Sequence, residues 1–302
     1  MDLQFLFQFG SEGSKKDQFQ WLHKLIFGPN DLLYICDKND YCIKVFDQYG
    51  KYQFHFGSEG SGKDQFQRPN GLCFGPDDLL YVSDLLNNHI QVFDQNGKYQ
   101  FYFSSKGSQE GHFNYLYGLC FGPNDLLYIC DTDNHRIQIF DKDGKFHFQF
   151  GSKGSEEYQF KYPEGICFGP NGLLYVFDRY NHRIQVFNQD GIFKFSFGSY
   201  GKEKGQFEYP QGMCFGPNGL LYISDKINNR IQVFDQYGIF KFKFGSKGSK
   251  EGQFQLPYGL CFGPNDLLYV SDLLNNRIQV FQHRKHQSLY QILAQKLNQK
   301  KK

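Results

Sequence analysis

Hydrophobic and polar residues alternate in short runs along the chain, and residues 118–150 show the arrangement. A short apolar run at 118–121 ends at a Gly-Pro-Asn-Asp turn sequence, and a second run at 126–130 ends at Asp131. Residues 136–140 and 145–150 then alternate between apolar and polar side chains, with Asp-Gly between them. A period of two is typical of strands, and Asp-Gly is a hairpin sequence. The pattern predicts four consecutive antiparallel strands, with a polar loop between the second and the third.

This four-strand pattern occurs six times with a period of 47 residues. A Phe-Gly-Pro tripeptide marks each copy, with its glycine at Gly28, Gly75, Gly122, Gly169, Gly216 and Gly263. The aspartate that ends the second run keeps the same spacing, at Asp37, Asp84, Asp131, Asp178, Asp225 and Asp272. Alternation of the β type excludes helical arrays of similar period, and four strands in about 47 residues form one propeller blade. The sequence therefore predicts an all-β, six-bladed β-propeller.

The two ends of the chain share one predicted blade. The fourth strand is found at 52–56, 99–103, 146–150, 193–197 and 240–244, but no sixth copy follows Phe281. A matching run stands instead at residues 3–9. We expect this N-terminal strand to pair with the last blade and close the ring, which removes an open sheet edge. The predicted domains are a propeller over residues 1–282 and a basic tail over residues 283–302.

Composition adds little to the choice of function class. The chain has 302 residues, 19% of them aromatic, and a formal charge of +2, which marks neither disorder nor a polyanion-binding protein. No leader and no membrane span is evident, so we expect a monomeric cytoplasmic protein. Five of the eight cysteines follow the 47-residue period and no Cys-x-x-Cys pair exists, which favours small buried hydrophobes over zinc ligands. No cofactor is expected.

The repeat unit at 252–281 resembles the NHL-repeat family. Its elements are Gly-Gln-Phe before the first strand, the Pro-x-Gly that enters it, Tyr-x-x-Asp, and Asn-Arg-Ile-Gln-Val-Phe. Asn134-His135-Arg136 and Asn181-His182-Arg183 contain the Asn-His-Arg core in full. The kelch Gly-Gly and the WD40 Trp-Asp are absent. The chain looks like the propeller of tripartite-motif proteins without their RING and B-box regions, so ubiquitin-ligase activity is not implied.

The resemblance implies a six-bladed propeller that binds protein or single-stranded RNA on one face, and a minority of six-bladed relatives are metal-dependent lyases or lactonases. It also implies an ion pair within each blade, such as Asp131 with Arg136. The first unit has Cys42 in place of this arginine and the second has His89. We expect looser inner loops in these two blades.

Two sets of positions differ from blade to blade, while the turns at the other end barely change. The residue that enters the first strand is His23, Asn70, Tyr117, Glu164, Gln211 or Tyr258. The two residues after the strand-end aspartate vary as well, and from these we select Lys38, Arg179, Tyr180 and Lys226. Alternating strand directions place both sets at one end of the ring, around the mouth of the central channel. We predict that these ten residues form the ligand-binding face, because variable loops on a rigid scaffold commonly carry recognition.

The alternative is neutral drift in solvated loops. Aliphatic side chains expected to be exposed at the same end argue against drift, since clustered apolar residues are typical of an interface. They are Leu85, Leu86, Ile227, Leu273 and Leu274.

Three function classes remain open. A protein or peptide partner is favoured, with single-stranded RNA, or a role in substrate recognition beside a ubiquitin ligase, as the alternatives. Tyr115, Tyr162 and Tyr209 could stack on bases, but Glu164 and the strand-end aspartates oppose phosphates. A metal-dependent lyase or lactonase is a minor alternative, because Glu164 and His23 lie on opposite blades. We therefore expect no catalytic and no metal-binding residues.

The C-terminal tail is basic, whereas the rest of the chain is acidic. Residues 283–302 carry six basic and no acidic side chains, which leaves the propeller with a formal charge of −4. Ser288 and Gln291 have capping-box spacing, and leucines follow at helical intervals. The tail is predicted to form a short amphipathic helix over about 289–299.

Overall fold

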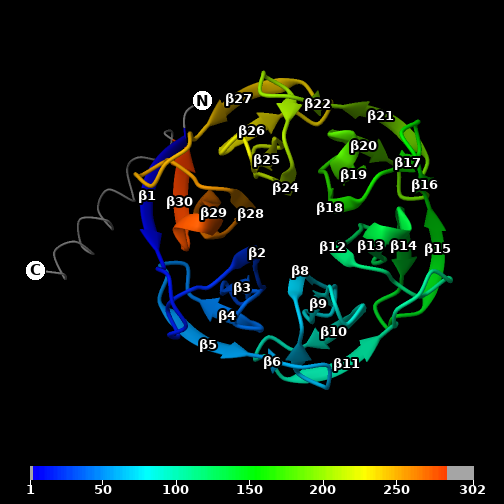
Figure 1. Cartoon of the computed structure of the whole chain (residues 1–302), viewed down its shortest axis with the longest axis horizontal. Coiled ribbons are helices and arrows are strands. Elements are labelled where there is room, and N and C mark those ends of the chain that lie inside the picture. The colour runs from blue at the N-terminus through cyan, green and yellow to red at the C-terminus, as the bar shows by residue number, and fades with distance from the viewer. Residues whose placement is uncertain (1–2, 284–302) are drawn as a thin grey trace, which may run out of the picture.

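A computed structural model describes residues 3–283 of the chain as six four-stranded antiparallel sheets arranged around one axis (Figure 1). The all-β, six-bladed propeller expected from the sequence is confirmed. The predicted tail helix lies outside the described residues.

Each blade runs from an innermost to an outermost strand. Blade 1 consists of β2 (Leu22–Phe27), β3 (Leu33–Asp37), β4 (Cys42–Phe46) and β5 (Tyr52–Phe56). Blade 2 consists of β8 (Pro69–Phe74), β9 (Leu80–Asp84), β10 (His89–Phe93) and β11 (Tyr99–Phe103). Blade 3 consists of β12 (Leu116–Phe121), β13 (Leu127–Asp131), β14 (Arg136–Phe140) and β15 (Phe146–Phe150).

The remaining three blades follow the same order. Blade 4 consists of β18 (Pro163–Phe168), β19 (Leu174–Asp178), β20 (Arg183–Phe187) and β21 (Phe193–Phe197). Blade 5 consists of β24 (Pro210–Phe215), β25 (Leu221–Asp225), β26 (Arg230–Phe234) and β27 (Phe240–Phe244). Blade 6 consists of β28 (Pro257–Phe262), β29 (Leu268–Asp272), β30 (Arg277–His283) and the N-terminal strand β1 (Leu3–Phe9).

The N-terminal strand closes the ring as predicted. β1 pairs antiparallel with β30, with Phe5 opposite Phe281 and Phe9 opposite Ile278. Figure 1 shows the blue start of the chain beside the orange-red strand β30. Residues from both ends of the chain therefore complete one sheet, and the edge of β30 is paired with β1 where the ring closes.

Short connections that the sequence analysis did not foresee link the blades. Three parallel two-residue pairs join β6 (Ser58–Glu59) to β7 (Gln65–Phe66), β16 (Ser152–Lys153) to β17 (Gln159–Phe160), and β22 (Ser199–Tyr200) to β23 (Gln206–Phe207). Short 3-10 turns occur at η1 (Thr132–Asn134), η2 (Arg179–Asn181), η3 (Pro264–Asp266) and η4 (Leu273–Asn275). The phenylalanine that ends each connection, such as Phe66 against Phe93, is fully buried.

The hydrophobic core lies between neighbouring blades. Leu119 of β12 packs in one cluster with Cys73 and Val92 of blade 2. The tyrosine of each Tyr-x-x-Asp element is fully buried, and its hydroxyl usually reaches the next blade, as Tyr128 donates to the Gln189 backbone oxygen at 2.8 Å. Each blade is thereby fastened to the next by apolar contacts and one buried hydrogen bond.

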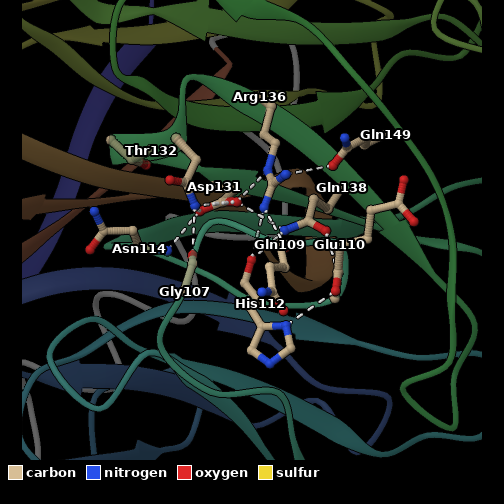
Figure 2. A network of polar contacts seen from close by, with 12 residues as sticks. Gly107, Gln109, Glu110, His112, Asn114, Asp131, Thr132, Arg136, Gln138 and Gln149 are labelled. Carbon is tan, nitrogen blue, oxygen red and sulfur yellow. Dashed lines mark hydrogen bonds and ion pairs between the residues drawn. The ribbon is translucent and has the colours of Figure 1, made fainter.

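The strand-end aspartate of each blade is the centre of a polar network (Figure 2). Asp131 is fully buried and accepts hydrogen bonds from Arg136 Nε at 2.7 Å, Gln138 Nε2 at 2.9 Å and the Asn114 backbone N–H at 2.8 Å. Arg136 also donates to the backbone oxygens of Gln109 and His112, which ties the connection before β12 to the blade. The predicted Asp131–Arg136 pair is confirmed, and blades 4 to 6 repeat it.

The two blades without this arginine differ from each other. In blade 1 the Lys44 ammonium contacts Asp37 at 2.9 Å and Asp40 at 2.5 Å. Blade 1 lacks the arginine, but Lys44 lies two residues after Cys42 and so on the same strand face, and its ammonium takes the place of the missing guanidinium. In blade 2, Asp84 is bonded by Asn87 and by two backbone N–H groups, without any cation among the described residues.

The cysteines fit their predicted structural role. All eight are free, and each is buried or half-buried. Burial raises the pKa of the Cys167 thiol to about 12. Within residues 3–283 the structure contains no helix with the length and apolar character needed to span a membrane.

Candidate functional site

Six of the ten predicted site residues form a ring around the propeller axis, which we call the inner ring. Each lies at the equivalent position of one innermost strand: His23 on β2, Asn70 on β8, Tyr117 on β12, Glu164 on β18, Gln211 on β24 and Tyr258 on β28. Because the blades repeat around the axis, these positions converge (Figure 1). All but Tyr117 are at most 5% exposed, so they line the axis and do not project into solvent.

Neighbouring members of the inner ring contact one another across blade boundaries. His23 Nδ1 lies 3.1 Å from Asn70 Oδ1, and the His23 ring stacks on Tyr258 with 4.1 Å between ring centroids. Gln211 Nε2 donates to Glu164 Oε2 at 2.9 Å. Five of the six residues are therefore preorganised by mutual contacts. No two neighbouring blades carry the same side chain at this position.

The other four predicted residues lie on the segments that join the second and third strands, which we call the mouth loops. Arg179 donates to Glu164 Oε1, and its guanidinium lies 5.1 Å from the ring of Tyr180 and 5.2 Å from that of Tyr209. Lys226 Nζ lies 5.3 Å from the ring of Tyr258. The inner ring and the mouth loops together are the mouth face.

Burial and like charges lower the pKa of His23, Lys38 and Lys226 on the mouth face. Burial, together with Arg68 and Lys226 nearby, lowers the pKa of Lys38 to about 8. Burial and then Arg179 lower the pKa of Lys226. His23 is neutral at pH 7, because burial and then Lys38 hold its pKa well below the ordinary value. Burial raises the pKa of Glu164, opposed by Arg179.

One residue of this site escaped the sequence-based selection. Lys24 occupies the position that is glycine in the other five units, and its Nζ donates to the Gln211 backbone oxygen of blade 5 at 3.3 Å. Its side chain thus joins blade 1 to blade 5. The replacement of glycine by lysine in this one unit is the sequence feature that could have identified Lys24 as part of the site.

The expected exposure of the loop aliphatics is correct for only some of them. Ile227 and Leu274 are 40% and 47% exposed, but Leu85 and Leu273 are buried and Leu86 is half-buried. Leu85 and Leu273 directly follow the strand-end aspartate, at the position where Thr132 turns inward and donates to the Pro163 backbone oxygen. The residue directly after the aspartate thus turns toward the neighbouring blade or the axis, and the next one toward solvent.

Aromatic side chains form a row along the mouth loops of blades 3 and 4 and the connections that lead into blades 4 and 5. Successive ring centroids lie 4.6 to 5.9 Å apart in the order His135, Tyr162, Tyr180, Tyr209, His182 and Tyr200. Tyr180 and Tyr200 are strongly exposed. Such a row can present both flat apolar faces and hydroxyl groups to a ligand.

The opposite face uses its side chains internally. Asn124 Nδ2 donates to the Tyr128 hydroxyl at 3.0 Å, and Asn171 and Asn218 repeat this contact in their blades. The uniformity of these turns therefore follows from their structural task. Within the described residues, no group of three or more His, Cys, Asp or Glu side chains is placed to hold a metal ion.

Comparison with known proteins agrees with this architecture. The sequence profile of the NHL repeat matches residues 66–93, 113–140, 160–187 and 207–234, which lie in blades 2 to 5. A search of curated protein sequences finds no significant match.

Several solved structures share the fold. Virginiamycin B lyase from Staphylococcus aureus is similar over 94% of this chain and 86% of its own, with 17% identity and a TM-score of 0.64. A gluconolactonase from Xanthomonas campestris is similar over 88% of this chain and 86% of its own, with 14% identity and a TM-score of 0.64. An auxiliary nutrient binding protein from Bacteroides thetaiotaomicron is similar over 93% of this chain and 76% of its own, with 12% identity and a TM-score of 0.70.

Proposed function

The chain is a β-propeller of NHL repeats, and from this premise we propose that it is a non-enzymatic module that binds a protein or peptide on its mouth face. The observation that carries the proposal is the group formed by Glu164, Arg179, Tyr180 and Tyr209. Glu164 orients the Arg179 guanidinium, which lies against both tyrosine rings. Arg and Tyr held in place by such contacts are the side chains that most often dominate protein interfaces.

The surroundings of this group also support a protein partner. Tyr162, Tyr180, Ile227 and Leu274 are among the more exposed large side chains, and all four lie on the mouth face or at its border. Apolar and aromatic side chains mixed with a few oriented polar groups are typical of an interface. The opposite face also exposes large side chains, notably Tyr237 and Ile239, which makes it the matched control surface.

Catalysis is the less favoured alternative, although some proteins of the same fold are named as a lyase and a gluconolactonase. Glu164 is the one carboxylate of the inner ring, and Arg179 and Gln211 already bond both of its oxygens. A carboxylate engaged in this way is poorly placed to act as a general base or a metal ligand.

Single-stranded RNA is the second candidate, and the aromatic row is the observation in its favour. Stacking of bases on such rings tolerates many sequences. The strand-end aspartates, which we expected to oppose phosphates, are turned into the blades and bonded there. A continuous cationic track beside the row would strengthen this candidate, but the basic groups of the mouth face gather near the axis.

Capture experiments with the full chain test the proposal. The tagged protein is incubated with host lysate, with and without nuclease, and the retained proteins are quantified. We expect nuclease-resistant capture that the double variant Arg179→Ala/Tyr180→Ala abolishes. The matched control Lys142→Ala/Tyr237→Ala changes an exposed cation and an exposed tyrosine on the opposite face and should retain it. Loss of capture only in the control would assign binding to the wrong face, and loss on nuclease treatment would favour RNA.

A further inference from the structure

We infer that the mouth face contains an anion site, formed by Lys24, Lys38, Asn70, Arg179 and Lys226, that receives a carboxylate group of an acidic peptide. The inference rests on the proposed function and specifies the chemistry of its ligand. Three features support it: buried donors without acceptors, lysines without counter-ions, and the origin of these groups on several blades around one axis.

Two buried donors of the mouth face have no acceptor among residues 3–283. They are Asn70 Nδ2 and Arg179 Nε. Asn70 is 2% exposed, and its other amide atom, Oδ1, is engaged by His23 Nδ1. A buried donor without a partner destabilises the folded protein, and an incoming oxygen acceptor would recover this free energy. Both atoms are donors, so the complementary ligand atom is an acceptor.

The cations of this site outnumber the carboxylates that face them. Lys24, Lys38 and Lys226 form no ion pair within the described part of the chain, and Glu164 is already bonded to Arg179. Asp37 and Asp225 directly precede Lys38 and Lys226, but they pair with Lys44 and Arg230 inside their blades. The excess positive charge near the axis therefore belongs to the site and is not neutralised locally.

The protonation behaviour of these lysines agrees with a missing anion. Burial lowers the pKa of Lys24, Lys38 and Lys226, and positively charged neighbours lower that of Lys38 and Lys226 further. A carboxylate bound among them would reverse the effect of the like charges and favour the charged ammonium forms.

The arrangement fits a carboxylate of a peptide better than a nucleic-acid backbone. The cations come from blades 1, 4 and 5, and Lys226 is close enough to Lys38 and to Arg179 to affect protonation, whereas a strand of RNA requires charges along a groove. Arg179 can still use free N–H groups toward an oxyanion, and Tyr180 and Ile227 at the border offer apolar contacts for neighbouring peptide residues. An acidic side chain directed into the mouth supplies the acceptor and the negative charge that these groups lack.

Binding of short peptides to the full chain tests the inference. The probe is acetyl-tetraglutamate amide, its neutral control is acetyl-tetraglutamine amide, and the comparison ligands are inorganic phosphate and an oligouridylate. We expect the glutamate peptide to bind and the glutamine peptide not to bind. Lys38→Gln/Lys226→Gln should weaken binding of the glutamate peptide about tenfold or more, because two converging charges are lost.

The matched control is Lys98→Gln/Lys145→Gln, which removes two exposed charges from turns of the opposite face. It should bind like the wild type, and since both variants keep the basic tail, non-specific attraction to the tail cannot produce the difference. Lys24→Met provides a second variant, with thermal melting as the check on folding.

Each other outcome has a defined meaning. Equal binding of both peptides, or equal loss in both double variants, would overturn the anion site. Competition by phosphate at similar concentration would overturn its assignment to a peptide carboxylate, and tighter oligouridylate binding lost in Lys38→Gln/Lys226→Gln would reassign it to RNA. Lysate capture that is lost in Arg179→Ala/Tyr180→Ala but not in Lys38→Gln/Lys226→Gln would overturn this inference alone and leave the proposed function standing.

Discussion

The hydroxyl of Tyr222 lies 2.9 Å from Nε2 of His283, and this contact joins blade 5 to blade 6 at the seam of the ring. In the blades before it, the equivalent hydroxyl donates to a backbone oxygen 61 residues further on, as seen for Tyr34, Tyr81, Tyr128 and Tyr175. His283 is also 61 residues after Tyr222, but β30 has no hairpin there because β1 supplies the outer strand. The imidazole therefore takes the place of a turn carbonyl.

Replacing His283 by alanine should weaken this seam. The variant leaves the buried Tyr222 hydroxyl with Asn218 as its remaining side-chain partner, at a cost of about 1–2 kcal/mol in the free energy of unfolding. The melting temperature should fall by a few degrees, about 2–4 °C per kcal/mol. Thermal melting of His283→Ala beside His147→Ala, an exposed histidine of an outer strand, measures the effect. Equal melting temperatures for His283→Ala and the wild type would show that the contact does not stabilise the seam.

Deleting residues 1–10 should open the ring. The deletion removes the pairing with β30, the Phe5–Phe281 contact at 6.1 Å and the hydrogen bond from Arg277 to Gln8. We expect a fall of about 10 °C or more in the melting temperature and new protease cleavage in blade 6. A chain that ends at His283 is the control for loss of a terminal segment. A melting curve unchanged by the N-terminal deletion would contradict closure by β1.

The architecture could be predicted because its signals are local and repeated. Six copies of a turn sequence fix where strands start and end, and the missing sixth outer strand identifies its replacement at the other end of the chain. The pair of Asp131 and Arg136 was expected from the family resemblance, and in the structure adjacent antiparallel strands place these residues opposite each other.

Side-chain direction at single positions was harder to predict. Leu85 and Leu273 were expected to be exposed, but the residue after the strand-end aspartate turns inward in each blade, and its burial depends on the neighbouring blade. Lys44 and Lys24 replace residues of other types in only one copy. Lys44 contacts Asp37 of its own blade and Lys24 contacts Gln211 of blade 5, and both contacts depend on three-dimensional proximity that a single repeat does not encode.

Placing in blade 2 the arginine that blades 3 to 6 carry should stabilise the protein. Asp84 is fully buried without a cation, and His89 Nε2 is buried without a partner among the described residues. Arg136 makes the equivalent contacts in blade 3, so an arginine at position 89 would reach Asp84 and the backbone oxygens of Gly62 and Gln65. His89→Arg should raise the free energy of unfolding by about 1–2 kcal/mol. The matched control His55→Arg adds the same group on an exposed outer strand and should have little effect.

The same variant should reduce the loss of stability in acid. Burial lowers the pKa of His89 below its ordinary value, so the folded state binds this proton less well than the unfolded state. The stability linked to neutral His89 is present above the unfolded pKa of about 6.5 and is lost as the pH falls through it. Denaturant unfolding at pH 7.5 and pH 5.5 should show a smaller difference for His89→Arg than for the wild type. His23, His135 and His182 share the direction of this shift, so acid sensitivity is reduced but not abolished.

Any non-specific binding of RNA should depend on the basic tail. The propeller carries a formal charge of −4, and residues 283–302 carry +6. For single strands, the logarithm of the binding constant falls by about 0.7 per neutralised phosphate for each tenfold rise in salt concentration. A chain that ends at His283, which keeps the contact to Tyr222, should lose most of its oligouridylate affinity and most of its salt dependence. Lys38→Gln/Lys226→Gln in the full chain should keep both, because two charges near the axis make no track for a backbone. If the shortened chain instead bound RNA as tightly as the full chain, the aromatic row and the mouth cations would have to supply that affinity. RNA would then replace a peptide as the favoured ligand of the mouth face.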